Sequence, residues 1–340
     1  MAYEPRTFSA VAAIGILCAG GAAAQTTMTY AYSENPSSVV AAESFERMVE
    51  SQTNGEIQVN TVIHGALGAD RDVVDQLMLG ELELYVPGVH ALSAVAPNFQ
   101  FFDAPYVFSN RREFYALMED EEFVDYLNTY LQDASNGRLM FMGAAENSVR
   151  NLYTAAGPIE TPEDLGSVKL RVTPGPLNIQ IWQALGVGSV VGLSGSERNQ
   201  ALQSGIIDGV EGSLAGALGN GHLDVLDNIT MTGHSYSYMA YLMNAEFFDS
   251  LSDEHKQVIR NAVDLAITVQ NGAAITQEQD ALEEARADGN TVTTPSAAQL
   301  QEWRDVAYPV GQEFISEQLD QEFVDQAEQA LEDVRSRIEG

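Results

Sequence analysis

Apolar and polar residues alternate in short runs and recur at helical spacing along the first part of the chain. The segments 27–32 (TMTYAY) and 56–64 (EIQVNTVIH) alternate as half-buried strands do, and a helical pattern between them closes at Gly55. A second helical pattern covers 70–80, and a third strand is expected over 82–88. This order of strands and helices predicts a parallel sheet with helices on both faces.

A similar succession of elements follows residue 139. The pattern predicts strands over 139–146, 168–172 and 189–193 and helices over 176–187 and 196–205. The chain is therefore expected to hold two α/β units, without a sequence repeat between them. One helical pattern from Asp253 to Arg286 would span about 50 Å at 1.5 Å per residue, longer than one small domain requires. We expect this helix to bridge the two units and further helices to follow residue 294.

The N-terminal 24 residues differ from the rest of the chain. Arg6 is followed by an apolar, Ala/Gly-rich run over 11–24 that ends in small residues. This composition predicts a secretory signal, residues 1–24, cleaved between Ala24 and Gln25. A membrane anchor is the alternative, but the run is short for about 30 Å of hydrocarbon. The one cysteine, Cys18, lies inside this segment, so the mature chain would have no disulfide, Cys–metal site or Cys nucleophile.

The chain is strongly acidic, with 49 Asp and Glu against 16 Lys and Arg and a formal net charge of −33 at pH 7. Such a field repels nucleic acid and anionic membrane surfaces, so neither is expected as a partner. It also repels anionic small molecules. Acid excess suits a saline habitat, because at about 1 M salt the Debye length is about 3 Å and self-repulsion is screened. Plain solubility charge is the alternative interpretation.

Catalytic and cofactor motifs are weak. The run 192–196 (GLSGS) places Ser196 where a nucleophile elbow requires glycine, and the glycine-rich run 186–192 lacks the spacing of a dinucleotide loop. The five histidines include no zinc-ligand pair four residues apart. We therefore predict no metal, no cofactor and no enzymatic activity. A secreted hydrolase that uses two of the many carboxylates is the alternative from a different class.

Five sequence blocks carry a family resemblance. They are GALGADRDVVDQLMLGELEL, FFDAPYVF, ENSVRNLYTAAGPIETPEDLGSVKLRV, ALQSGIIDGVEG and TGHSYS, all between residues 65 and 245. In this order and spacing they resemble the extracytoplasmic solute receptors of TRAP transporters, the DctP type, from about Tyr30 to about Ala266. The resemblance implies a two-lobed α/β periplasmic binding protein fold with a ligand cleft between the lobes and a long helix spanning both.

The resemblance also implies how the chain is divided and what it does. We expect lobe I over 26–147 and 237–275, and lobe II over 148–236 and 276–340. The mature protein would be a periplasmic receptor that does not span the membrane, binds a small organic acid and delivers it to the TRAP membrane subunits. A receptor for a zwitterionic compatible solute is the alternative within the same class.

Arg171 is the principal candidate for ligand binding. It stands at the end of a strand-like run, before a Pro-Gly-Pro turn, and its side chain should point away from the face of Leu170 and Val172. Ligands of open α/β sheets bind beyond the carboxyl ends of strands, and a guanidinium offers two parallel donors to a carboxylate. The resemblance implies that Arg171 forms a bidentate salt bridge with the ligand and that Arg150 assists. A solvated strand cation or an internal ion pair is the alternative.

Four further candidates follow from the resemblance. Glu211 matches a family glutamate near the cleft and would orient Arg171, with packing or capping as the alternative. Glu34 lies in the first strand-to-helix loop, which lines the cleft in the family, or in an exposed turn. Ser213 follows Gly212 where the family often has Asn-Pro, which leaves room for water or a bulkier ligand. Tyr236 lies near the lobe crossover and is expected to contact the ligand.

One further position affects the expected ligand, and several others are expected to have structural roles. The tyrosine common in the family helix after 196–197 is Asn199 here, and this departure leaves the identity of the solute open. His234 is expected to be structural, and Phe101, Phe102 and Tyr106 are expected to pack in the core or at a hinge rather than to stack on ligand.

Overall fold

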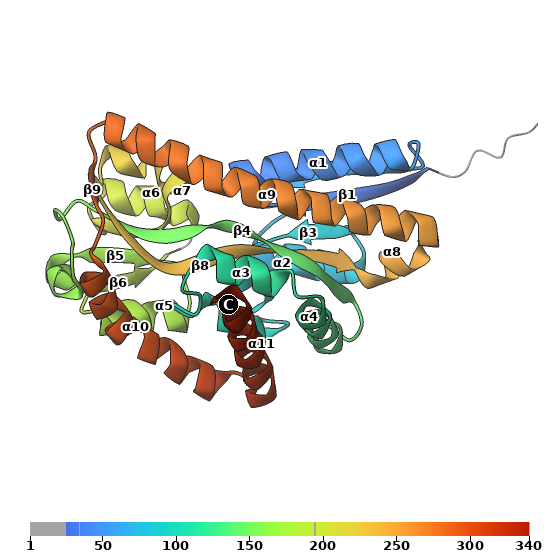
Figure 1. Cartoon of the computed structure of the whole chain (residues 1–340). Coiled ribbons are helices and arrows are strands. Elements are labelled where there is room, and N and C mark those ends of the chain that lie inside the picture. Colours follow the sequence, from blue (N-terminus) through green and yellow to red (C-terminus); the bar gives the residue numbers. More distant parts are fainter. Residues whose placement is uncertain (1–24, 34, 194, 340) are drawn as a thin grey trace, which may run out of the picture.

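The computed structural model describes residues 25–33, 35–193 and 195–339. The predicted signal segment, residues 1–24, and Glu34 therefore lie outside the described residues. A single sheet of nine strands runs through the described part of the molecule, in the order β2-β1-β3-β8-β4-β7-β5-β6, with β9 added on β8. Helices cover both faces of this sheet (Figure 1). The fold is the α/β class that the sequence predicts, but the sheet is mixed rather than parallel, because β8 pairs antiparallel with β3 and β4, and β4 pairs antiparallel with β7.

The N-terminal unit, called the first lobe here, has the predicted opening. Its elements are β1 (Thr26–Tyr32), α1 (Pro36–Gln52), β2 (Ile57–Ile63), α2 (Asp70–Leu79) and β3 (Leu84–Val86). β1 pairs in parallel with β2 on one side and β3 on the other. Asn35 caps α1 by accepting a hydrogen bond from the backbone of Ser38 at 2.8 Å, and Gly80 ends α2 at φ 72°, a conformation that suits glycine.

Short 3₁₀ segments and two helices complete the first lobe. They are η1 (His64–Ala66), η2 (Val89–Leu92), η3 (Pro97–Asp103), α3 (Arg111–Met118) and α4 (Glu121–Ala134). Phe101 and Phe102 of η3 are buried, and their rings meet edge to face at 5.2 Å. Tyr106 is also buried, and its hydroxyl donates to the backbone oxygen of Thr232 at 3.4 Å. These three aromatic residues therefore pack in the core.

The second lobe repeats the strand–helix pattern after a 3₁₀ turn, η4 (Pro162–Ser167). Its elements are β5 (Lys169–Val172), α5 (Pro176–Ala184), β6 (Ser189–Gly192), α6 (Gly195–Gln203), β7 (Gly209–Ser213) and α7 (Leu214–Gly219). β5 pairs in parallel with both β6 and β7. The carboxyl ends of these three strands therefore lie at one edge of the sheet, where open α/β sheets bind ligands.

Three long elements connect the lobes. β4 (Leu139–Thr154) and β8 (Asn228–Asn244) pair antiparallel along almost their whole length, and α9 (Asp253–Ala287) is a continuous helix of 35 residues. Figure 1 shows both strands crossing the middle of the molecule and α9 lying along it. The predicted bridging helix is confirmed. The strand predicted over 139–146 is longer than expected, because it continues through the crossover into the second lobe.

The crossover in β4 is irregular. The register between β4 and β8 shifts at three places, between Phe141 and Gly143, between Glu146 and Ser148 and between Arg150 and Leu152. Bulges bend a strand and redirect its side chains. The side chains of residues 146–151 consequently face several directions near the junction of the two lobes.

The C-terminal elements pack on both lobes. They are η5 (His222–Asp224), α8 (Ala245–Ser250), β9 (Thr291–Thr293), α10 (Ala297–Gln318) and α11 (Gln321–Glu339). α10 contacts α5 of the second lobe, whereas α11 contacts α3 of the first. Arg335 of α11 donates to Glu113 of α3 at 3.1 Å. The range 276–340 expected for lobe II thus includes one helix that packs on the first lobe.

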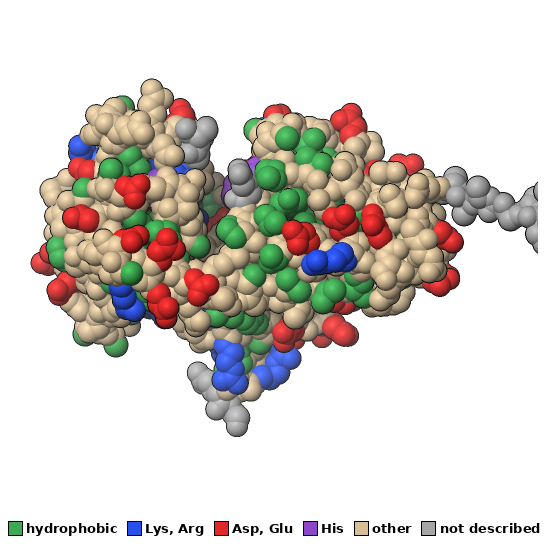
Figure 2. Space-filling model, turned by 90° about the horizontal axis from the view of Figure 1, so that it is seen from above, with side chains coloured by type: hydrophobic (Ala, Val, Ile, Leu, Met, Phe, Trp, Pro, Cys, Tyr) green, Lys and Arg blue, Asp and Glu red, His purple; other side chains and the backbone are tan. Residues whose placement is uncertain are grey.

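Two faces of the sheet carry separate cores. One face packs α1, α8 and α9 around residues such as Phe45 and Ile259, and the other packs the aromatic cluster of Phe99 and Phe102. Seen from above, the molecule is hollowed between its two parts (Figure 2). Within the described ranges, none of the helices combines the length and the apolar character needed to cross a membrane.

Candidate functional site

A cavity of about 170 Å³ lies where the two lobes face each other. Polar and aromatic side chains from both lobes line it: Ser33, Asn35, His90 and Asp103 from the first, Asn147 at the crossover, and Arg150, Thr173, Asn178, Trp182 and His234 from the second. Thr173 directly follows β5, and Asn178 and Trp182 belong to α5. The cavity therefore lies at the carboxyl edge of the parallel strands of the second lobe.

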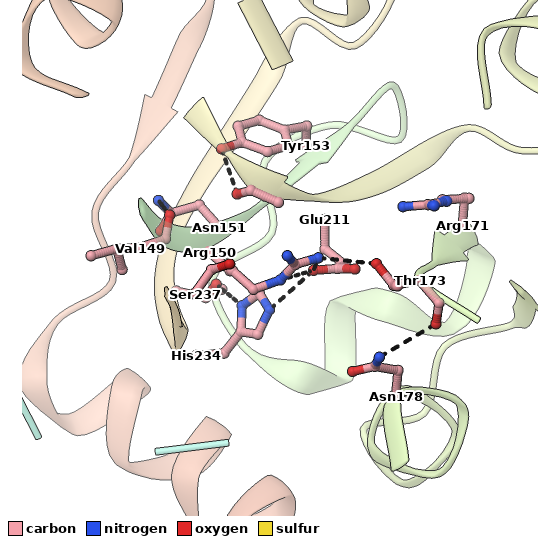
Figure 3. A network of polar contacts seen from close by, with 12 residues as sticks. Val149, Arg150, Asn151, Tyr153, Arg171, Thr173, Asn178, Glu211, His234 and Ser237 are labelled. Atoms are coloured by element: carbon pink, nitrogen blue, oxygen red, sulfur yellow. Dashed lines mark hydrogen bonds and ion pairs between the residues drawn. The ribbon is translucent and has the colours of Figure 1, made fainter. Parts of the chain in front are cut away.

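Arg150 and Glu211 form the central ion pair of the cavity wall. The Arg150 Nε donates to Glu211 Oε2 at 2.7 Å, and the terminal Nη2 lies 2.5 Å from the same oxygen. Nη2 also lies 3.4 Å from Thr173 Oγ1. The Glu211 side chain is 3% exposed and that of Arg150 24% exposed. The guanidinium thus lies between a buried carboxylate and the open cavity (Figure 3).

His234 completes this network. Its Nε2 lies 3.5 Å from Glu211 Oε2, its Nδ1 lies 2.8 Å from Thr232 Oγ1, and its ring meets that of Trp182 edge-on at 5.1 Å. Burial lowers the pKa of His234, although Glu211 opposes this shift, so the ring is neutral at pH 7. A neutral ring that donates from Nε2 and accepts at Nδ1 fits both contacts. His234 also lines the cavity, so its structural role stays a prediction.

The charge of Arg150 sets the protonation of Glu211. Burial would raise the pKa of Glu211, but the charge of Arg150 and the hydrogen bond from His234 together lower it well below its ordinary value. Burial would likewise lower the pKa of Arg150, but Glu211 raises it. Both groups are therefore charged at neutral pH. The Oε1 atom of Glu211 is buried and has no hydrogen-bond partner among the described residues.

Arg171 lies behind this wall rather than among the residues that line the cavity. It is 4% exposed, and its Nε donates to the backbone oxygen of Leu193 at 2.8 Å. Leu170 and Val172 are fully buried in the core on the other face, as the alternation in the sequence predicts. In Figure 3 the guanidinium of Arg171 points toward Glu211. Burial, followed by the charge of Arg198, lowers its pKa to about 10, so it stays charged at pH 7.

Arg198 of α6 is a neighbouring cation that the sequence interpretation missed. Burial lowers its pKa, with the charge of Arg150 adding to this shift and Glu211 opposing it. Its Nε is buried and has no hydrogen-bond partner in the described part of the chain. A cation near the N-terminal end of a helix opposes the helix dipole, and this was the one signal that the sequence offered.

His222 lies beside these arginines. Its Nε2 lies 2.9 Å from Asn199 Oδ1, while its Nδ1 is buried without a hydrogen-bond partner among the described residues. Burial and the charges of Arg198 and Arg171 lower the pKa of His222 to about 4. The ring is therefore neutral, and the proton lies on Nε2, which faces the amide oxygen of Asn199.

The first-lobe wall carries its own titratable cluster. The Nε2 atoms of His90 and His64 lie 3.1 Å and 3.2 Å from the two oxygens of Asp70, and the hydroxyl of Tyr85 donates to Asp70 at 2.7 Å. Burial would raise the pKa of Asp70, but the hydrogen bonds from His90 and Tyr85 lower it to about 2. Burial would lower the pKa of His90, but Asp70 and Asp103 raise it.

Two other predicted candidates have different surroundings. Ser213 caps α7 by accepting a hydrogen bond from the Gly216 amide at 3.1 Å, and it lines a second opening of about 660 Å³ between the lobes. Tyr236 is half-buried and packs edge-on against Phe108 at 6.3 Å, outside the set that lines the 170 Å³ cavity. Glu34 falls outside the described residues. Ligand contact by these three residues stays a prediction.

The family comparison covers most of the chain. Residues 28–318 match the model of a family described as bacterial extracellular solute-binding protein, family 7. The ectoine-binding periplasmic protein TeaA of Halomonas elongata is 28% identical over 346 residues, which cover 100% of this chain and 99% of that protein. The ectoine/5-hydroxyectoine-binding periplasmic protein UehA of Ruegeria pomeroyi is 30% identical over 280 residues, 81% of this chain and 80% of that protein.

Solved structures show the same arrangement. A TRAP periplasmic solute-binding protein from Ochrobactrum anthropi, with its C-terminus bound in the ligand-binding pocket, matches with a TM-score of 0.84 and 27% identity. The match covers 93% of this chain and 97% of that structure. The two-lobed architecture predicted from the sequence is confirmed by this similarity.

Proposed function

The chain belongs to the bacterial extracellular solute-binding protein family 7, and from this premise we propose that Arg171 and Arg150 hold a ligand carboxylate between the lobes. Proteins of this family bind solutes and are not enzymes, so the alternative of a secreted hydrolase is not supported. The chain is a TRAP-type solute-binding protein, and we propose that its solute is a small organic acid. We further propose that a cleaved signal at residues 1–24 delivers it to the periplasm, where it hands its solute to TRAP membrane subunits.

The observation that carries the carboxylate site is the gathering of cations at and behind one wall of the cavity in an acidic protein. Arg150, Arg171 and Arg198 influence one another electrostatically, although the whole chain has a net charge of −33. Like charges held close together in a partly buried site are unfavourable until an anion neutralises them. An anionic ligand would restore that balance, and a guanidinium holds a carboxylate through two parallel hydrogen bonds.

The two predicted arginines would have different roles. Arg150 already donates to Glu211 with two of its nitrogens, so it can add only part of its donor capacity to a ligand. Arg171 uses Nε for Leu193, and its guanidinium points toward Glu211 (Figure 3). This difference supports Arg171 as the main anchor once the lobes close, and Arg150 as the assisting residue.

Thermal unfolding with matched ligands tests the proposal. Protein that has been unfolded, dialysed and refolded to remove carried-over solute is heated with small organic acids and with their neutral amides. A ligand at 100 times its Kd adds about 2.7 kcal/mol to the free energy of unfolding, so binding acids should raise the melting temperature clearly. Equal shifts with acid and amide, or conversion of the added compound, would contradict a carboxylate receptor.

A zwitterionic compatible solute is the second candidate. The similarity to the ectoine-binding proteins TeaA and UehA favours it, and Asp103 and Trp182 in the same cavity would suit the cationic part of such a ligand. Competition calorimetry between ectoine and simple organic acids separates the two candidates. Tighter binding of ectoine than of every acid tested would favour the zwitterion.

A further inference from the structure

His90 places an imidazole ring on the first-lobe wall of the cavity of about 170 Å³. Its Nε2 lies 3.1 Å from Asp70 Oδ2, and Asp70 itself is not among the residues that line this cavity. The other carboxylate oxygen, Oδ1, accepts a hydrogen bond from the Tyr85 hydroxyl at 2.7 Å and lies 3.2 Å from His64 Nε2. Asp70 is therefore held from behind by β3 and η1 while it holds the ring of His90.

Gly88 leaves the space that the His90 ring fills. A Cβ atom at Gly88 would lie 2.8 Å from His90 Nδ1 and 2.7 Å from Cε1, well inside the usual contact distance of about 3.5–4.0 Å. The backbone at Gly88 has φ −61° and ψ 144°, which any residue can adopt, so the neighbouring ring rather than the backbone requires glycine here. Gly88 also lines the cavity, and the Nδ1–Cε1 edge of the ring therefore lies over this part of the wall.

The contact with Asp70 determines which ring nitrogen of His90 is left for a ligand. Burial would raise the pKa of Asp70, but the hydrogen bonds from His90 and Tyr85 lower it to about 2, so the carboxylate only accepts hydrogen bonds near neutral pH. His90 Nε2 therefore carries a proton in both charge states of the ring. Nδ1 has no hydrogen-bond partner among the described residues, so it can donate when the ring is charged and accept when the ring is neutral.

Charged groups on three elements act on His90. Burial lowers its pKa, but Asp70 of α2 and Asp103 of η3 raise it, and Arg150 of β4 opposes that rise. Asp103 and Arg150 line the same cavity, whereas Asp70 does not. The net shift is upward, so the charged, donating form of the ring persists above the ordinary histidine pKa of about 6.5.

We infer that Asp70 is a positioning residue for solute binding, because it holds the His90 ring over Gly88 and leaves Nδ1 to donate a hydrogen bond to an oxygen of the solute. This inference rests on the proposed function, in which arginines of the second lobe hold a carboxylate. His90 belongs to the first lobe, so a solute that contacts both His90 and these arginines would join the two lobes. Asp70 does not touch the solute and acts only through His90.

Calorimetry at pH 6 with acetate, lactate and succinate tests this role. For each acid that binds, Asp70→Asn should raise Kd about tenfold, which corresponds to the loss of roughly one hydrogen bond to a charged group. The direction of the change is informative, since removal of a negative charge from an acidic protein should by itself favour an anion. Asp75→Asn removes the same charge from an exposed position of α2 and should not raise Kd.

A second background separates positioning from a structural role. In His90→Ala protein, Asp70→Asn should change Kd by less than about twofold, because the residue through which Asp70 acts is gone. An equal effect of Asp70→Asn with and without His90 would make Asp70 a purely structural residue and overturn the inference. Gly88→Ala keeps every charge, and its Cβ should push the His90 ring away from Asp70 and also raise Kd.

NMR spectroscopy of isotope-labelled histidine rings requires no ligand. The His90 signals, identified by their absence in His90→Ala, should show the neutral ring protonated on Nε2 and a pKa that falls in both Asp70→Asn and Gly88→Ala. The pH at which acid binding weakens should fall with this pKa. An unchanged His90 pKa in both variants would refute the inference and leave the receptor proposal intact, whereas failure of wild type to bind any organic acid would contradict the receptor proposal itself.

Discussion

Two nitrogens of Arg150 converge on one oxygen of Glu211, at 2.7 Å for Nε and 2.5 Å for Nη2, while the other Glu211 oxygen has no hydrogen-bond partner among the described residues. The pair joins β4 to β7 at the cavity, so it links the crossover strand to the second lobe. Glu211 is 3% exposed and Arg150 is 24% exposed, so the pair is largely buried, and removal of one partner leaves the other charge without compensation.

Glu211→Gln should therefore destabilise the protein. We expect the free energy of unfolding to fall by about 3–5 kcal/mol, the usual cost of breaking a buried pair by removing one partner. Urea denaturation measured by circular dichroism checks this value. Glu163→Gln, at an exposed position of the same lobe, serves as the control and should change stability by less than about 1 kcal/mol. A small effect of Glu211→Gln would mean that Arg150 finds another partner.

The same pair predicts the response to acid. The folded-state pKa of Glu211 is lowered, so its contribution to stability is complete above the ordinary carboxyl pKa of about 4.3 and is lost as the pH falls further. Asp70 adds to this loss between about 4 and its folded pKa of about 2. In Glu211→Gln, the free energy of unfolding should depend less steeply on pH in this window than in the wild-type protein. Thermal melts followed by fluorescence between pH 3 and pH 6 would measure this difference.

Arg171→Lys should weaken ligand binding far more than Arg150→Lys does. Lysine keeps the charge but loses the fork, and charge-assisted hydrogen bonds contribute roughly 1.5 to 3 kcal/mol each. Loss of a buried two-bond clamp should thus raise Kd by at least about a hundredfold, at about 1.4 kcal/mol per decade. Arg150→Lys should cost less, because Glu211 already takes much of its donor capacity. Calorimetry decides, and near-native affinity of Arg171→Lys would mean that another residue anchors the carboxylate.

A network of ion pairs around Arg111 offers a test of the crossover between the lobes. Arg111 of α3 donates to Glu146 of β4 at 2.6 Å and to Glu278 of α9 at 2.6 Å, and Glu146 is fully buried. Arg111→Gln should lower the free energy of unfolding by about 3 kcal/mol or more, because it leaves Glu146 without its cation. The exposed neighbour Arg112 supplies the control variant Arg112→Gln, which should have little effect in the same urea titration.

Lobe closure is a property that the same hinge must allow. Hinge bending around a ligand is common in periplasmic binding proteins, and here β4, β8 and α9 run through the junction. The radius of gyration from small-angle scattering should decrease when ligand saturates the wild-type protein. An unchanged radius at saturation would contradict closure of the cleft.

The periodic parts of the fold were predictable from the sequence, and the site was predictable only in part. Alternation and helical spacing gave β1, α1, β5 and α9, because each of these elements buries one regular face. β8 was missed although Thr230, Thr232 and His234 alternate with Ile229 and Met231, because these polar residues are themselves buried and the strand has no single apolar face there. No local pattern could bring these residues to the cavity, since their partners lie on other strands.

The predicted arginines show the same limit. The spacing around Arg171 correctly gave its strand and the face opposite Leu170, but not its bond to Leu193, which comes from a later loop. Arg198, His90 and Asp103 were missed because each is an isolated polar residue in its own segment. Burial and mutual distance give these residues their shifted pKa values, and both depend on tertiary structure.

His90 makes ligand binding sensitive to pH. It lines the cavity together with Arg150, and Asp70 and Asp103 raise its pKa. Its positive charge is therefore present below about pH 6.5, the ordinary pKa of histidine, and is lost as the pH rises through the raised pKa of the folded protein. The affinity for a carboxylate ligand should thus fall between pH 6 and pH 9. His90→Gln should remove this dependence and bind more weakly at pH 6 than wild type, as calorimetry at several pH values would measure. An unchanged pH profile in His90→Gln would assign the titration to another group.

The rate of ligand association should rise with salt, contrary to the usual behaviour of an anion that approaches a cationic site. An anion far from the protein meets a net charge of −33, and this repulsion extends over the Debye length, about 30 Å at 0.01 M and about 8 Å at 0.15 M. The arginines act only once the ligand has entered the cavity, where salt screens them less. Added salt consequently removes more repulsion than attraction during the approach. Stopped-flow fluorescence across this range should show a rising association rate and a dissociation rate that changes less, while the neutral amide of the ligand should show neither trend as strongly. An association rate that falls with salt would mean that the local field of Arg150, Arg171 and Arg198 extends beyond the cleft and dominates the encounter.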